Sequence, residues 1–391
     1  MPRTHITGTV GLFLFSALVH VYVGLRLVPA LAAWPWAMLA LTLVLVCSGA
    51  LMPMGFYARR VQSRKLAHFL AWTGLLLMGL FSSLFVLTLL RDVVLAVAHL
   101  AQMAGWFDAA SNDLDDLVAF SAIVVPLAAL GITALGLRNA RRTAAVVTVD
   151  VPIAGLPQAL HGFTIAQISD IHVGLTIKRP YVTAIVESVN RLNADMVAVT
   201  GDLVDGSVAE LAFHVAPLAD LKSRHGTYFV TGNHEYYSGV HAWMRELERL
   251  DVRVLLNEHV VLKHGDAALV VAGVADPSAH HFDPSHRSDP ARAVAGAPSN
   301  VSVRLLLAHQ PRSAVAAARA GFQLQLSGHT HGGQFFPWNV LIKWFEPFAA
   351  GLHRLQDLWI YTSRGTGYWG PPKRFGAPSE ISFLRLVPQE R

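Results

Sequence analysis

Residues 164–172 read TIAQISDIH, a run of apolar and β-branched residues that ends in a carboxylate and an imidazole. Such a run predicts a short buried strand over 164–168. Asp170 and His172 are two residues apart, so both side chains can point the same way from an extended strand end and bind one ion. The stretch therefore predicts a strand that delivers metal ligands at its carboxyl end.

Polar residues follow predicted strands at four further places. The blocks are, in order, Gly201-Asp202, Gly232-Asn233-His234-Glu235, Ala308-His309 and Gly328-His329-Thr330-His331. The carboxyl ends of strands are where α/β sheets bind ligands, so five loops would converge on one edge. Carboxylate, imidazole and amide oxygen are ligands that Mn, Fe or Zn accept. A single histidine at a strand end is usually structural, but five such blocks in series predict a metal site.

The chain beyond Ala144 alternates short β-branched runs with helical stretches, which predicts an α/β domain over residues 144–391. The predicted strands are 145–149, 164–168, 196–200, 228–230, 269–274, 304–308, 323–326, 359–362 and 381–386. The predicted helices are 181–192, 208–221, 242–250 and 312–320.

The first 143 residues have a different composition and predict a membrane domain. The whole chain has a mean hydropathy of +0.42 and only 15% charged residues, too apolar for a typical soluble protein. Four apolar stretches are each near or above the roughly 20 residues that a membrane-spanning helix needs. They predict four transmembrane helices, over 6–28, 31–57, 66–90 and 117–137.

The charged loops predict the orientation of these helices. The loop after the second stretch is basic, with Arg59, Arg60, Arg64 and Lys65, and the loop after the third is acidic, with Asp108, Asp113, Asp115 and Asp116. By the positive-inside rule the first loop is cytoplasmic and the second lies outside. Arg138, Arg141 and Arg142 follow the fourth stretch. We therefore expect a multi-pass protein of the inner (plasma) membrane with a cytoplasmic catalytic half.

Composition also excludes some partners and cofactors. The net charge is +5, but no stripe of basic and aromatic residues occurs, so no nucleic-acid binding is expected. Cys47 is the only cysteine, which rules out a disulfide or a multi-thiolate metal site within one chain.

The five blocks resemble those of the calcineurin-like metallophosphoesterases, which are D-x-H, G-D, G-N-H-[DE], H and G-H-x-H in the same order. The resemblance covers about residues 164–334. The sequence GHTHGGQ at 328–334 and the tail over 363–381 are similar to a bacterial membrane-associated branch, which includes phosphodiesterases and UDP-diacylglucosamine hydrolases. The resemblance implies a β-sandwich flanked by helices.

The resemblance also implies a site with two divalent ions, Mn, Fe or Zn. Asp170, His172 and His331 would hold one ion, Asn233, His309 and His329 the other, and Asp202 would bridge them. His234 would contact a phosphoryl oxygen or protonate the leaving group, a role that suits a histidine near neutral pH. Glu235 could orient a ligand or simply cap its loop, and both readings stay open.

Three other features carry weaker expectations. The His-rich residues 280–287, before a segment of small residues at 291–298, favour a solvated flexible loop over a contact with metal or substrate. The aromatic segment 335–348 fits a bilayer surface, a slot for an acyl chain, or the core. The late basic residues Arg364, Lys373 and Arg374 could bind a second phosphate or an anionic head group. Arg364 and Arg374 are the candidate substrate ligands.

The leading hypothesis is a membrane-anchored phosphoesterase that cleaves a phosphodiester or pyrophosphate bond, with the anchor favouring a lipid-linked substrate. The alternative is a membrane sensor or scaffold whose phosphoesterase-like domain binds a phosphorylated ligand without turnover. A transporter is disfavoured because the four stretches carry almost no charge from which to build a pathway.

Overall fold

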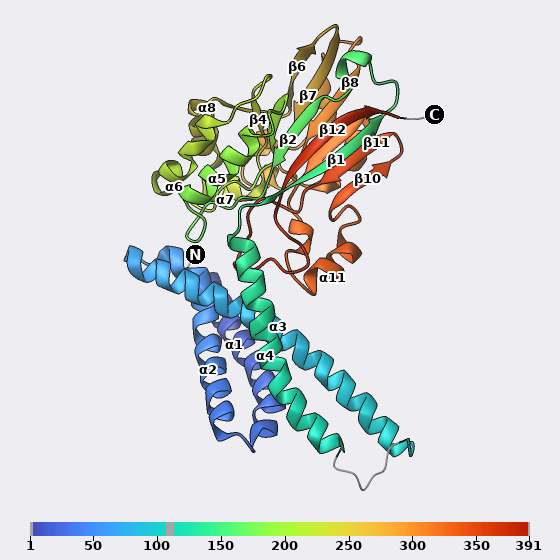
Figure 1. Cartoon of the computed structure of the whole chain (residues 1–391). Coiled ribbons are helices and arrows are strands. Elements are labelled where there is room, and N and C mark those ends of the chain that lie inside the picture. The colour runs from blue at the N-terminus through green and yellow to red at the C-terminus, as the bar shows by residue number, and fades with distance from the viewer. Residues whose placement is uncertain (1–2, 107–112, 390–391) are drawn as a thin grey trace. The chain divides into compact units, whose positions relative to one another are not determined.

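The computed structural model describes residues 3–106 and 113–389, and the chain divides into two compact units (Figure 1). The helical unit comprises Met1–Arg138 together with Gly370–Phe375. The second unit comprises Asn139–Trp369 and Gly376–Arg391. The sequence predicts a single division at 143/144, and it gives no sign that a late segment belongs with the helices.

The helical unit contains α1 (Arg3–Leu27), α2 (Pro35–Tyr57), α3 (Arg64–Met103) and α4 (Asp113–Arg141). All four are long and apolar enough to cross a membrane. The third is 40 residues long and runs past the predicted end at residue 90. Asp113, Asp115 and Asp116 belong to the first turn of α4 rather than to a loop, where carboxylates favour the positive end of the helix dipole. Asp108 lies outside the described residues.

A charged pair, Arg91 and Asp92, lies within the long helix α3, just past the end of the third predicted apolar stretch at residue 90. Arg91 is buried and donates to Ser121 Oγ at 2.8 Å and to two backbone carbonyls. The next residue, Asp92, accepts from Tyr22 Oη at 2.6 Å and from Arg26 Nε at 2.8 Å. Because its charges are paired or hydrogen-bonded, the pair does not interrupt the helix.

The segment Gly370–Phe375 is held by hydrogen bonds inside the helical unit. Lys373 Nζ donates to Gly79 O and to Ser83 Oγ, both at 2.6 Å, and Lys373 is 1% exposed. Arg374 N donates to Gly136 O at 2.9 Å. A side chain at Gly136 would bring its Cβ within 2.6 Å of Lys373 Cγ, so this glycine makes the space that the lysine fills.

The second unit is a mixed α/β domain with two six-stranded sheets. The first sheet has the order β1-β12-β2-β3-β4-β5, with bounds β1 (Ala145–Ile153), β12 (Glu380–Pro388), β2 (Thr164–Ile168), β3 (Met196–Val199), β4 (Thr227–Phe229) and β5 (Val252–Val254). Strands β2 to β5 are parallel, and β12 is antiparallel to β2. The sequence does not predict β5, which is three residues long.

The second sheet has the order β10-β11-β9-β8-β7-β6, with bounds β10 (Gly351–Leu355), β11 (Leu358–Thr362), β9 (Leu324–Ser327), β8 (Val303–Leu307), β7 (Ala267–Gly273) and β6 (Glu258–His264). Strands β7, β8, β9 and β11 are parallel, and the unpredicted strands β10 and β6 pair antiparallel at the edges. One buried cluster includes Ile165 of the first sheet and Leu305 of the second, so the sheets share a core. The strict description as a β-sandwich stays a prediction.

The helices of this unit are α5 (Arg179–Asn190), α6 (Val208–Val215), α7 (Asn233–Ser238), α8 (Val240–Arg249), α9 (Pro290–Val294), α10 (Ala314–Arg319) and α11 (Trp338–Phe345). The helix predicted over 208–221 becomes a 3₁₀ turn at Ala216–Asp220, where Pro217 cannot continue the α-helical hydrogen bonds. Helix α9 occupies part of the segment predicted to be flexible. Asp289 caps it by accepting from Arg292 N.

Candidate metal centre

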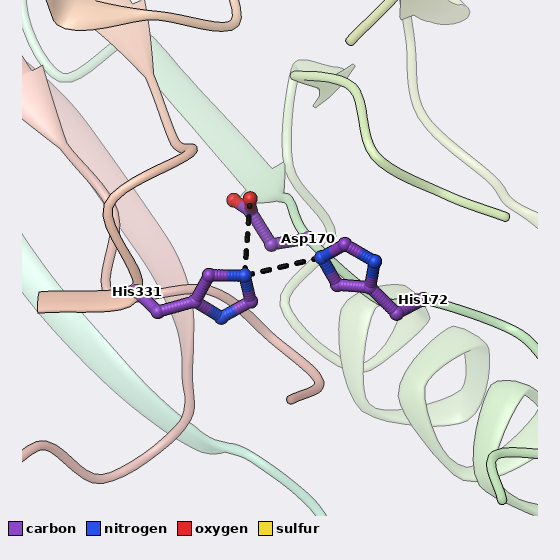
Figure 2. A group of neighbouring side chains, drawn as sticks. All are labelled: Asp170, His172 and His331. Carbon is purple, nitrogen blue, oxygen red and sulfur yellow. Dashed lines mark hydrogen bonds and ion pairs between the residues drawn. The ribbon is translucent and has the colours of Figure 1, made fainter. Parts of the chain in front are cut away.

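The first group of ligand candidates joins the end of β2 to the loop after β9. Asp170 and His172 follow β2, and His331 follows β9 (Figure 2). His331 Nε2 lies 3.1 Å from His172 Nε2 and 3.6 Å from Asp170 Oδ1. All three residues are buried. The structure thus brings together the three residues that were predicted to share one ion, although His331 lies 159 positions after His172.

The second group contains Asp202, His309 and His329, which follow β3, β8 and β9. His309 Nε2 lies 3.1 Å from Asp202 Oδ2 and 3.2 Å from His329 Nδ1. The same Asp202 Oδ2 is 3.9 Å from His172 Nε2 of the first group. Asp202 therefore lies between the two groups, and its bridging role stays a prediction.

The hydrogen bonds of two histidines orient their ring nitrogens for metal binding. His309 Nδ1 lies 2.8 Å from Thr200 O, a pure acceptor, so Nδ1 carries a proton and Nε2 is the ring nitrogen that faces Asp202. His172 Nδ1 lies 3.1 Å from Asp205 Oδ1, which likewise leaves its Nε2 lone pair facing His331. Ring nitrogens and carboxylate oxygens that face one another at these distances can share a cation, either a proton or a metal ion.

A buried acceptor gives a second test of whether these residues fit a metal ion. Asn233 Oδ1 is buried and has no hydrogen-bond partner among the residues that the structure describes. Buried amide oxygens normally accept a hydrogen bond, so one that accepts none is available as a metal ligand. On both observations, the side chains present fit divalent ions bound by oxygen and nitrogen.

The pKa values of the two histidines in the second group are shifted in opposite directions. Burial opposes protonation of His309, yet the charge of Asp202 and its hydrogen bond raise the pKa of His309 well above its usual value. Burial lowers the pKa of His329 to about 4, so this ring stays neutral and available as a ligand. The site favours positive charge beside Asp202.

The backbone at the ligands is strained. Five of the ligand candidates have a positive φ, which non-glycine residues rarely adopt: Asp170 (54°), His172 (55°), Asp202 (51°), His329 (72°) and His331 (51°). Such strain persists only where the surroundings impose it, and it clusters at functional sites. The left-handed turns let side chains from separate strand ends point into one small volume.

Two glycines allow the loops to approach one another. A Cβ at Gly201 would lie 2.7 Å from Gly232 N and 2.8 Å from His309 Nδ1. A Cβ at Gly232 would collide with Asp202. These positions therefore need glycine for close backbone approach rather than for the turn alone.

Glu235 connects the two loops that carry Asp202 and Gly232 through hydrogen bonds to their backbones. Its carboxylate accepts from four backbone N–H groups, those of Asp202 (3.0 Å), Leu203 (2.8 Å), Val204 (3.3 Å) and Gly232 (2.7 Å). Burial and the charge of Asp202 raise the pKa of Glu235 to about 7, although these donors favour the ionised form. Glu235 thus both caps α7 and fixes the loop that carries Asp202.

His234 lies beside the ligands with its ring partly open. Its Nδ1 is 2.5 Å from Asp205 Oδ1, its Nε2 is 4.0 Å from Asp202 Oδ2, and its side chain is 16% exposed. Burial opposes protonation, but the hydrogen bond to Asp205 and the nearby carboxylates raise the pKa of His234. The ring therefore keeps its second proton to a higher pH than a free imidazole does.

Asp205 is a functional candidate that the sequence reasoning missed. It accepts from both His172 and His234, and these three side chains lie close enough together to hold an ion themselves. We assign Asp205 to orienting the two rings, because Nδ1 of each faces it at hydrogen-bond distance. A second acid three residues after Asp202 in the same strand-end loop was the signal that could have identified it.

The predicted substrate arginines, Arg364 and Arg374, belong to different units of the chain. Arg364 Nε pairs with Glu380 Oε2 at 2.6 Å, and its Cγ closely approaches Gly332, which follows His331. Arg374 is fully buried and belongs to the helical unit. Their roles as substrate ligands stay predictions.

The aromatic segment 335–348 is mostly exposed. No residue of α11, all of which the structure describes, is buried, and Trp344 and Phe345 are 78% and 76% exposed. Only Phe335 and a few neighbours pack inward. The possibility of a core segment, which the sequence left open, does not hold for α11.

Comparison with known proteins identifies the class. Residues 163–333 match the family model of calcineurin-like phosphoesterases. A zebrafish (Danio rerio) "transmembrane protein with metallophosphoesterase domain" is 33% identical over 387 residues, which cover 96% of this chain and 86% of that protein. The chain therefore belongs to the calcineurin-like metallophosphoesterase superfamily, and with its apolar helices it is membrane-associated.

Other relatives show how widely this likeness extends. The cow (Bos taurus) protein with the same description is 42% identical over 65% of this chain, but the match spans only 60% of the cow protein's length. An uncharacterized metallophosphoesterase of Helicobacter pylori is 40% identical over 57% of this chain and 60% of its own. The relatives thus include animal proteins, so the likeness is not restricted to a bacterial branch.

Solved structures resemble the chain only distantly. A 5′-nucleotidase precursor from Thermus thermophilus has a TM-score of 0.38 and 15% identity, with 57% of this chain and 54% of that chain covered. A likeness at this level carries no conclusion about substrate.

Proposed function

We propose that the protein is a membrane-anchored dinuclear phosphoesterase that hydrolyses a phosphodiester or pyrophosphate bond in a lipid-linked substrate. The observation that carries the proposal is the convergence of imidazole lone pairs and buried carboxylates in two adjoining groups. The ligand types suit Mn, Fe or Zn. The metallophosphoesterase family of the chain supports a hydrolytic activity.

The ligands divide between the two ions as the resemblance implies. Asp170, His172 and His331 would hold the first ion, and Asn233, His309 and His329 the second, with Asp202 shared between them. When bound, two such ions would lower the pKa of a water molecule and stabilise the charge of an in-line displacement at phosphorus.

His234 would supply the proton for the leaving group. Asp205 accepts the Nδ1 proton, which orients the ring and favours the imidazolium. Its Nε2 proton is then available to an alkoxide or phosphate oxygen as it departs. The partial exposure of the ring lets it contact substrate while the buried ligands do not.

Exposed aromatic side chains support a lipid-linked substrate. Helix α11 starts seven residues after His331 and presents Trp344 and Phe345 to its surroundings. Tyr237 and Trp369, which are 62% and 48% exposed, contact the ring of His234 at centroid distances of 5.3 and 5.9 Å. Aromatic side chains of this kind suit the bilayer interface and the apolar part of an amphipathic substrate.

We further propose that the four helices cross the inner membrane and leave the phosphoesterase domain in the cytoplasm. The proposal rests on Arg59, Arg60, Arg64 and Lys65 against the acids at the start of α4. A cytoplasm-dependent reporter fused after residue 391 should be active. An active export-dependent reporter at the same place would overturn this orientation.

The test of activity uses full-length protein in detergent, stripped of metal and then supplied with manganese. A generic substrate, bis(4-nitrophenyl) phosphate, should be hydrolysed only after manganese is added, and Asp202→Asn should abolish the hydrolysis. UDP-diacylglucosamine, phospholipids and cyclic nucleotides then discriminate among substrate classes. Tight binding of these compounds without turnover of any would favour the sensor or scaffold alternative instead.

A further inference from the structure

A cluster of possible metal ligands lies outside the site described above. It consists of His241 in the first turn of α8 and of Asp283 and His286 in the His-rich loop. Asp283 Oδ2 lies 3.3 Å from His241 Nε2 and 3.7 Å from His286 Nε2. The two rings are 5.2 Å apart between centroids and inclined at 68°. None of these residues belongs to the five blocks.

The carboxylate of Asp283 is fixed by its own turn. Its Oδ1 accepts from Ser285 N at 2.9 Å and from Ser285 Oγ at 2.6 Å. These bonds satisfy one oxygen and direct the other, Oδ2, between the two histidines. A carboxylate anchored in this way has already lost the rotational freedom that metal binding would otherwise cost.

The ring of His286 is fixed as well. It is 6% exposed, and its Nδ1 lies 2.9 Å from the hydroxyl of Tyr236. That hydroxyl is also 3.4 Å from Thr231 Oγ1, so it can accept the Nδ1 proton and donate its own. In this arrangement the Nε2 lone pair faces a carboxylate oxygen, an arrangement that a cation stabilises.

We propose that His241, Asp283 and His286 bind a zinc ion. Two imidazoles and one carboxylate form a borderline ligand set that zinc accepts at tetrahedral positions, and a water molecule can take the fourth. The side chain of His241 is 60% exposed, so the ion can enter from solvent and the water position stays open. The proposal does not depend on hydrolytic activity.

The ion would connect the His-rich loop to the helices beside the candidate metal centre. His241 belongs to α8, and Tyr236 belongs to α7, the helix that begins with Asn233 and His234. Phe282 in the loop contacts Tyr236 and Tyr237 at centroid distances of 5.7 and 5.6 Å. A zinc ion would thus fix the loop that packs on both tyrosines.

The experiment measures zinc in full-length protein. Metal-stripped wild type, His241→Ala, Asp283→Asn and His281→Ala are each saturated with zinc, desalted and analysed for bound metal. We expect His241→Ala and Asp283→Asn to contain one equivalent less than wild type. His281→Ala, an exposed histidine of the same loop outside the cluster, should match wild type.

Combination with Asp202→Ala separates this site from the two-ion centre. Zinc in the Asp202→Ala protein should still fall by one equivalent when His241→Ala is added, whatever the state of the centre. Equal zinc content in wild type and His241→Ala would overturn the proposal, and so would an equal loss in His281→Ala. Cobalt substitution gives a second readout, since a visible absorption band of the loop site should disappear in the same two variants.

Discussion

At the scale of single residues, we assign His234 to proton transfer and not to metal binding. Its Nδ1 contacts Asp205, and we assign no ion to it. We expect His234→Asn to retain wild-type manganese content while turnover of a diester with a poor leaving group falls by about 10²–10⁴-fold. Elemental analysis and steady-state assays on one preparation check both parts.

Two results would contradict this role of His234. A variant that loses an equivalent of manganese would make His234 a ligand, which the proximity of His172, Asp205 and His234 makes physically possible. Unchanged turnover with the poor leaving group would remove the acid role. Asp205→Asn is the matched variant, because it disturbs the orientation of the ring while leaving the ring in place.

Backbone strain at the ligands leads to a second prediction. His331 has a φ of 51°, a conformation that costs an L-residue about 1–2 kcal/mol but costs glycine little. Both His331→Ala and His331→Gly remove the ligand, but only glycine relieves the strain. Without metal, the glycine variant should unfold about 2–4 °C above the alanine variant, since about 1 kcal/mol shifts the midpoint by that amount in a domain of this size.

Thermal unfolding of the two metal-free proteins, followed on the same day in the same detergent, checks the order. An alanine variant that is as stable as the glycine variant would show that the left-handed turn at His331 costs nothing. The sequence could not predict this strain, because the close approach of loops that are distant in sequence imposes the positive φ.

At the level of elements, helix α7 depends on Glu235. The carboxylate accepts four backbone N–H groups, whereas an amide has one acceptor oxygen and would turn an NH₂ group toward the remaining donors. Hydrogen bonds to charged groups contribute about 1.5–3 kcal/mol each. We therefore expect Glu235→Gln to destabilise the manganese-loaded protein by about 2 kcal/mol or more, which lowers its unfolding midpoint by about 4–8 °C.

Glu246→Gln is the control for this variant. Glu246 pairs with the exposed Arg249 on α8, and such surface pairs contribute only a few tenths of a kcal/mol. The unfolding midpoint of the Glu246→Gln protein should change by about 1 °C. Equal effects of the two substitutions would show that Glu235 is only a loop cap.

The elements also show which parts of the fold sequence reasoning could reach. Strands β2, β3 and β8 were predicted because buried parallel strands are nearly continuous runs of β-branched and aliphatic residues. Edge strands such as β6 and β10 are half-exposed and more polar, so they lack that pattern. Helix α7 has six residues, too few to show a helical repeat.

The ligand candidates followed from the predicted strand ends, because chain order and residue type suffice to suggest convergence on one edge. Asp205 did not, because its role depends on the direction of two histidine rings. The late segment Gly370–Phe375 could not be assigned to the helices either, since its contacts are with glycines and a serine that are distant in sequence.

At the scale of the whole molecule, the helices raise the question of whether they only tether the enzyme. A chain that begins at Asn139 keeps every ligand candidate, so it should bind manganese and hydrolyse a soluble diester. It should lose most activity on bilayer-borne lipid, because confinement raises the effective concentration of a surface-bound substrate. Parallel assays of full-length and truncated protein on both substrates test this.

The segment Gly370–Phe375 is the part of the second half of the chain that truncation of the helices would disturb. Truncation removes the partners of Lys373, whereas Trp369, the residue just before the segment, contacts the ring of His234. Loss of soluble hydrolysis at intact metal content would mean that the helical unit shapes the site through this segment. The passive tether would then be wrong.

The two-ion centre is the central claim, and its metal content tests it most directly. Full-length protein carrying His241→Ala and Asp283→Asn, which removes the proposed loop site, is stripped, saturated with manganese and analysed for bound metal. Asp202→Ala in the same background should lose at least one equivalent, since Asp202 lies between both groups. The account predicts close to two equivalents before that substitution, and one or none at saturation would contradict it.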